Sequence, residues 1–220
     1  RPSGASKPFL GVGDPLLRDH PGPMETPNQN LRGGAVMSWL AQAPTRRNAS
    51  ALFRGGRADI NEIKALDSLP ESAVELTEMA ASLGGSTDDL YLRERAVESK
   101  IRGGLRLRDY RVLALATHGV LAGELVDLSE PALVLTPPDK ASDADDGLLT
   151  ASEITELELD ADWVILSACN TAGSDGKPGA EGLSGLARAF FYAGARALFV
   201  SHWPVVSETT VTMTTSMLAT

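Results

Sequence analysis

Sulfur and imidazole are scarce in this sequence. Its 220 residues contain one cysteine, Cys169, and three histidines at positions 20, 118 and 202. One cysteine cannot form an internal disulfide, and the histidines do not have the spacing of a zinc site. We therefore expect packing alone to hold the fold, with no metal and no cofactor.

Long apolar runs are also missing. Nowhere does the sequence reach the roughly 18 uninterrupted apolar residues that a membrane-spanning helix needs, and its beginning has no signal-type segment. Because 43% of the residues are hydrophobic, the chain can still build a globular core. We expect a soluble, cytoplasmic protein with no membrane partner, made of one domain over residues 1–220. Neither end carries a clear capping or closing signal, so we expect this domain to be truncated at both ends.

Basic residues are rare in the second half of the chain. Residues 1–110 contain 15 Lys and Arg against 14 Asp and Glu, whereas residues 111–220 contain 5 against 15. An acidic surface repels phosphate backbones and attracts cationic segments. Nucleic acid is therefore excluded as a partner.

Apolar runs alternate with helical patterns along most of the chain. The runs expected as strands are KPFLGVGDP, DDLYL, YRVLALATHG, PALVLTPP, DADWVILSAC and ALFVSHWP. The expected helices are ESAVELTEMAASL, RERAVESKI, TASEITEL and GLSGLARAFFYAGA. Strands that are apolar throughout belong to parallel sheets covered on both faces. The fold class expected is a three-layer α/β sandwich with a mostly parallel central sheet and helices on both faces.

Local signals mark some boundaries. Ser72 and Glu75, and Thr150 and Glu153, have the spacing of capping boxes, and Gly84-Gly85 predicts the end of the first long helix. Residues 20–61 are rich in Pro, Gly, Asn and Gln and predict an irregular insertion.

Two reactive side chains are expected at the carboxyl ends of strands. His118 follows VLALAT, and Cys169 follows WVILSA. Ligands of open parallel sheets bind at that end, so neighbouring strands would bring the imidazole and the thiol to one cleft. A cysteine hydrolase needs this pair, because the thiolate attacks and the imidazole moves the proton. The amides of Gly119 and Cys169 could then form an oxyanion hole. The alternative is that Cys169 packs in the core and His118 is a hydrogen-bonded surface residue.

Several blocks resemble one known family. ALATHG, LSACNTA and GLSGLARAFFYAGARALFVSHWPV, in this order, resemble the CHAT family, whose caspase-like domains often accompany tetratricopeptide repeats in bacteria. GVGDPLL and DGLLTASEI also resemble it. The resemblance implies a caspase-like sheet and a peptidase dyad. In it His118 is the general acid/base, Cys169 is the nucleophile, and the amides of Gly119 and Cys169 form the oxyanion hole.

The resemblance also implies a substrate site. Relatives bind a protein or peptide substrate as an extended strand at the sheet edge, and Ser201, His202 and Trp203 match the region that lines the groove. His202 is alternatively a wall or surface residue, and Trp203 a core anchor. The residue two positions before the nucleophile helps to set specificity in relatives. Here it is Ser167, which matches neither the glutamine of caspases nor the aspartate of metacaspases.

Other motifs fail on their spacing. The acidic segment DKASDADDG, residues 139–147, lacks the alternating ligands and final Glu of an EF-hand, which favours a solvated loop over a calcium site. GVG and GLSG complete neither a dinucleotide fingerprint nor a serine-hydrolase elbow.

The sequence thus predicts a caspase-like cysteine endopeptidase, a hydrolase regulated by a repeat domain or partner outside this chain. The rival hypothesis is a caspase-like interaction or scaffold module with a dormant dyad, since fold alone does not decide function.

Overall fold

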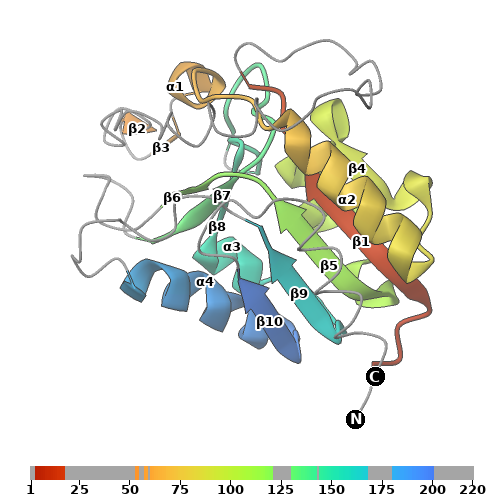
Figure 1. Ribbon diagram of the computed structural model, residues 1–220. Helices are drawn as coiled ribbons and strands as arrows, with labels where there is room; N and C mark the ends of the chain where they lie inside the picture. The colour runs from red at the N-terminus through yellow and green to blue at the C-terminus, as the bar shows by residue number, and fades with distance from the viewer. Residues whose placement is uncertain are drawn as a thin grey trace, which may run out of the picture.

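A five-stranded parallel sheet forms the centre of the protein (Figure 1). The computed structural model describes residues 3–17, 53–54, 57–58, 60–120, 130–142, 144–167 and 180–200. The order of the strands in the sheet is β10-β9-β5-β1-β4, and each neighbouring pair is parallel. The strands are β1 (Lys7–Gly13), β4 (Leu90–Leu92), β5 (Tyr110–Ala116), β9 (Trp163–Leu166) and β10 (Ala197–Val200). The predicted parallel sheet is confirmed.

Helices cover both faces of this sheet, so the predicted three-layer α/β architecture is also confirmed (Figure 1). The helix α2 (Pro70–Leu83) packs on one face, where Leu76 and Met79 meet Phe9 of β1 in a buried cluster. On the other face lie α3 (Ala151–Thr155) and α4 (Ala180–Ala193), which contribute Ile154 and Phe190 to the larger buried cluster.

Smaller elements surround this core. A second sheet is antiparallel, and β7 lies between β6 and β8 in it. Its strands are β6 (Gly119–Val120), β7 (Ala132–Val134) and β8 (Leu148–Thr150), so the strand predicted from PALVLTPP exists but lies outside the central sheet. The pair β2 (Phe53–Arg54) and β3 (Arg57–Ala58) precedes α1 (Ile60–Lys64). Most of the predicted insertion at 20–61 lies outside the described residues.

Two glycines of β1 let α2 approach the sheet closely. A Cβ atom at Gly13 would lie 2.6 Å from the Ala116 carbonyl oxygen and 2.7 Å from Leu76 Cδ1. At Gly11 it would lie 2.8 Å from Leu90 Cδ2. The GVG stretch therefore serves helix-to-sheet packing, because any side chain there would push the helix away.

The beginning of α2 differs from the prediction. Instead of capping the helix with Glu75, Ser72 donates its hydroxyl to the Leu69 carbonyl oxygen at 2.8 Å and accepts the Asp14 amide at 2.8 Å. The predicted capping box at Ser72 and Glu75 is therefore wrong, because tertiary partners take both side chains. Gly84 ends the helix with φ of 72°, as predicted.

The second capping box is confirmed. Thr150 Oγ1 accepts the Glu153 amide at 3.3 Å, and Glu153 Oε2 accepts the Thr150 amide at 2.9 Å. Both acceptors stay within the first turn of α3, so local chemistry is enough to fix this boundary.

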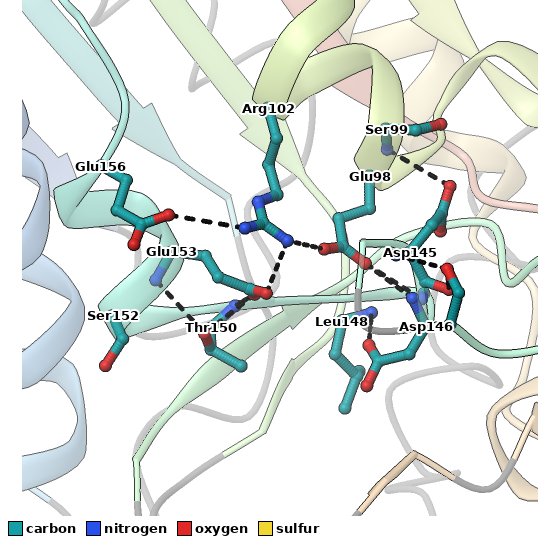
Figure 2. A network of polar contacts seen from close by, with 12 residues as sticks. Glu98, Ser99, Arg102, Asp145, Asp146, Leu148, Thr150, Ser152, Glu153 and Glu156 are labelled. Atoms are coloured by element: carbon teal, nitrogen blue, oxygen red, sulfur yellow. Dashed lines mark hydrogen bonds and ion pairs between the residues drawn. The ribbon is translucent and has the colours of Figure 1, made fainter.

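Residues 93–101, predicted as one short helix, form two separate turns. Arg93–Arg95 is a 3-10 turn, and Lys100–Gly104 is a π-helical turn. Arg102 in the second turn binds Glu98 at 2.9 Å and Glu153 of α3 at 2.8 Å (Figure 2).

Glu98 is the centre of this polar network. Its side chain is only 1% exposed, and it also accepts the backbone amides of Asp146 at 2.8 Å and Gly147 at 3.3 Å (Figure 2). Burial raises the pKa of Glu98 to about 7, although the bonds from Asp146 and Arg102 oppose the rise. The network joins the turn at 100–104 to α3 and to the segment before β8.

Gly13→Ala should lower the free energy of unfolding by about 1–3 kcal/mol, because the added methyl group overpacks the contact between α2 and the sheet. Gly103→Ala is the matched control, since a Cβ atom there meets nothing within 4 Å. It should leave stability unchanged or slightly higher. Urea unfolding of both variants tests this, and equal losses would contradict the close approach at Gly13.

Glu98 should make stability depend on pH. A folded pKa near 7 against an unfolded value of 4.5 means that the folded state holds the proton more tightly. The free energy of unfolding should therefore fall as pH rises between these values, by at most about 3 kcal/mol. Glu98→Gln should remove this part of the slope in urea unfolding from pH 5 to 8.

The experiment compares how steeply the free energy of unfolding changes with pH, and not its absolute value. Glu98→Gln also loses the hydrogen bond from Arg102, which changes the absolute stability. The exposed Glu94 supplies the control, and Glu94→Gln should keep the slope of the unsubstituted protein. An unchanged slope in Glu98→Gln would show that Glu98 titrates normally.

Candidate active site

The strands that precede the two predicted catalytic residues are neighbours. β5 pairs with β9 in register, Leu115 beside Leu166. Just beyond the paired region the Ser167 amide donates to the Leu115 carbonyl oxygen at 2.9 Å. The strands that precede His118 and Cys169 therefore end side by side, as the sequence predicts.

The imidazole of His118 is held by a backbone carbonyl. Its Nε2 atom lies 2.8 Å from the carbonyl oxygen of Asp67, in the segment between α1 and α2. A carbonyl oxygen only accepts hydrogen bonds, so Nε2 carries the proton and Nδ1 keeps its lone pair. Burial lowers the pKa of His118 below the ordinary 6.5, while the Asp67 contact opposes this effect. The ring is therefore neutral at pH 7 and able to accept a proton at Nδ1.

Gly119 begins β6 directly after His118. It lies opposite Leu133 of β7, and the Val134 amide donates to the His118 carbonyl oxygen at 2.9 Å. In an antiparallel ladder this makes Gly119 and Leu133 a non-hydrogen-bonded pair, in which each amide points away from the partner strand. The direction of the Gly119 amide is compatible with the predicted oxyanion hole.

Ser167 connects the end of β9 to α2. Its hydroxyl donates to Glu75 Oε2 at 3.1 Å, across 92 positions of sequence. Glu75 is only 7% exposed, and burial raises the pKa of its carboxyl; the bond from Ser167 opposes the rise and the charge of Glu78 adds to it. The buried carboxyl of Glu75 thus contacts Ser167, which stands two positions before the predicted nucleophile.

Four predicted site residues lie outside the described part of the chain. They are Cys169, Ser201, His202 and Trp203. Their roles and their distances from His118 remain predictions.

Two aspartates of the acidic segment bind backbone amides with their carboxylates. Asp145 Oδ2 accepts the Ser99 amide at 3.3 Å, and Asp146 Oδ1 accepts the Leu148 amide at 3.0 Å. In the residues that the structure describes, no group of three or more His, Cys, Asp and Glu side chains could hold a metal ion. Within the same residues, no helix is both long enough and apolar enough to span a membrane.

Sequence reasoning missed two groups at the site. The Asp67 carbonyl leaves no trace in the sequence, because every residue has one. Glu75 did leave a signal, since it lies four positions before the buried Met79 and so shares the apolar face of α2. Its spacing from Ser72 instead favours the capping box that the sequence predicts.

Comparison with known proteins identifies the family of this chain. The family model of the CHAT domain matches residues 13–219. This chain belongs to the CHAT domain family. Its sheet and helices are consistent with the caspase-like sandwich that the resemblance implied.

Two relatives are much longer than this CHAT domain. Tetratricopeptide repeat protein 28 of Mus musculus is 35% identical over 106 residues, which cover 43% of this chain and 4% of that protein. The Homo sapiens protein of the same name is 41% identical over 58 residues, 26% of this chain and 2% of that protein. No solved structure matches the chain.

His118 should titrate below 6.5 and carry its proton on Nε2, because burial disfavours the imidazolium and the Asp67 carbonyl accepts from that nitrogen. Nitrogen-15 NMR of the ring atoms measures both properties. With three histidines in the chain, a spectrum of His118→Gln assigns the signal. A proton on Nδ1 would contradict the Asp67 contact, and a pKa above 6.5 would show that burial does not outweigh that contact.

Proposed function

We propose that this CHAT domain is a cysteine endopeptidase that hydrolyses a protein substrate with His118 and Cys169. The observation that carries the proposal is the His118 ring, which the Asp67 carbonyl fixes with Nδ1 free to accept a proton. His118 lies just beyond β5, the neighbour of the strand that leads to Cys169. The family adds support, because the resemblance to caspase-like peptidases covers the same residues.

The proposed reaction follows from these roles. His118 Nδ1 takes the proton of the Cys169 thiol, and the thiolate attacks the carbonyl carbon of the scissile peptide. The amides of Gly119 and Cys169 donate to the resulting oxyanion. As the C–N bond breaks, His118 returns its proton to the leaving amine and an acyl-enzyme thioester remains. Water, deprotonated by His118, then hydrolyses the thioester and restores the thiol.

Asp67 acts through His118 in this proposal. When the ring takes up a proton it becomes a cation, and the Asp67 carbonyl dipole at 2.8 Å stabilises that form. The same bond stops the ring from turning Nε2 toward the thiol. Asp67 is thus a positioning residue, and its backbone rather than its side chain does the work.

The substrate and partners belong to the proposal too. We expect the peptide to bind as an extended strand near Ser201, His202 and Trp203. These residues follow β10, which is an edge strand of the central sheet. The names of the two relatives favour a tetratricopeptide repeat segment as a regulatory partner. We also propose that the protein is cytoplasmic and that it does not bind nucleic acid.

Labelling of the single cysteine tests the dyad. Because the chain has no other thiol, any iodoacetamide adduct reports Cys169 alone. The rate at pH 7 should fall about 100-fold in His118→Ala, the lower end of what a positioned proton acceptor contributes. Mass spectrometry over time measures the rate.

His20→Ala is the matched control, since it removes a histidine from the predicted insertion. Its labelling rate should equal that of the unsubstituted protein. If His118→Ala labels as fast as both, Cys169 is an ordinary thiol and the scaffold hypothesis takes the place of the peptidase.

A further inference from the structure

The carboxyl of Glu75 is incompletely satisfied. Oε2 accepts the Ser167 hydroxyl at 3.1 Å, but Oε1, although covered from solvent, has no hydrogen-bond partner among the described residues. The residue as a whole is only 7% exposed. A buried polar atom without a partner is unfavourable and calls for an explanation.

Among the residues that the structure describes, none supplies a compensating positive charge to Glu75. Within the described residues the groups that act on its carboxyl are the Ser167 hydroxyl and the negative charge of Glu78. A hydroxyl is a weak substitute for a cation, and a nearby carboxylate disfavours ionisation further. An incoming ammonium or guanidinium group would supply both the missing hydrogen bond and the missing charge.

Chain connectivity limits how far the proposed nucleophile can be from this carboxyl. The carboxyl is bonded to Ser167, and Cys169 follows two residues later, so at most about 7 Å of extended backbone separates Ser167 from Cys169. One extended lysine or arginine side chain covers such a distance. A substrate residue held at the thiol could therefore bring its charged end to Glu75.

We propose that Glu75 determines specificity, by binding the cationic side chain of a lysine or arginine next to the scissile bond. The inference rests on the proposed peptidase function and names its substrate class. Ser167 orients the carboxyl through Oε2 and leaves Oε1 for the substrate. The acidic second half of the chain supports the same choice, because it attracts basic segments before they dock.

The competing explanation is that Glu75 is purely structural and only joins α2 to the end of β9 through its hydrogen bond with Ser167. Glu75→Gln separates the two explanations, because the glutamine side chain has the same shape and can still accept from the Ser167 hydroxyl. A purely structural carboxyl would then be replaced without any change in substrate preference. A specificity residue would lose its preference for charge.

The first experiment measures cleavage by the full chain. A library of fluorogenic tetrapeptide amides varies the residue before the scissile bond over Arg, Lys, Gln, norleucine and Asp. The unsubstituted protein should prefer Arg or Lys over norleucine, and Glu75→Gln should reduce that ratio about 30-fold or more, the lower end of the effect of removing one partner of a buried charge pair. Glu71→Gln, an exposed carboxyl on the same helix that does not act on Glu75, should keep the ratio.

The second experiment does not depend on cleavage. Agmatine, which carries the guanidinium group of arginine, should bind the unsubstituted protein and Glu71→Gln in calorimetric titrations, and bind Glu75→Gln about 30-fold more weakly. Equal affinity for all three proteins would overturn the role of Glu75.

The outcomes separate the two proposals. Agmatine binding that depends on Glu75, without cleavage of any peptide, would support the cation site and overturn the peptidase. Cleavage with no preference for Arg or Lys, or with a preference that Glu75→Gln retains, would support the peptidase and overturn the specificity role.

Discussion

The parallel pairing of β5 with β9 is the constraint on which the site depends. With Leu115 beside Leu166, the carboxyl ends of both strands lie side by side, and the two residues of the proposed dyad follow shortly after them in the sequence. A slip of the register by one residue would turn every side chain of β9 to the other face. The buried residues of β9 alternate between two cores, since Val164 and Leu166 belong to one cluster and Ile165 to the other. Packing on both faces therefore fixes the position from which the chain departs toward Cys169.

The second constraint is the distance between α2 and the sheet. Gly11 and Gly13 remove the side chains that would hold the helix away, and Leu76 fills the space above them. The same approach brings Glu75, one position before Leu76, to the carboxyl end of β9, where it meets Ser167. The same packing of α2 on the sheet therefore fills the core and places Glu75 beside Ser167. The segment that precedes α2 carries the Asp67 carbonyl, which reaches His118.

The sequence predicted the elements whose cause is local or repetitive. The apolar runs of β1, β5 and β9, the glycine at the end of α2 and the capping box of Thr150 and Glu153 all follow from short-range rules. The prediction failed where a tertiary partner competes with a local one. Ser72 and Glu75 have the spacing of a capping box, but Asp14 and Ser167 take their side chains. The Asp67 carbonyl was beyond prediction, because only the folded chain decides which backbone atom faces an imidazole.

Two buried glutamates show how a structural carboxyl differs from one available for binding. Glu98 is 1% exposed, and its two oxygens accept from the Arg102 guanidinium and from two backbone amides. These bonds offset part of its cost of burial, and they join three segments. Glu75 is nearly as buried at 7%, yet among the described residues it has only the Ser167 hydroxyl. Because burial raises the pKa of both groups, exposure alone does not separate them. What separates them is that no described residue brings a cation to Glu75. Because this carboxyl lies beside the end of β9, it is the place to look for a charged substrate group.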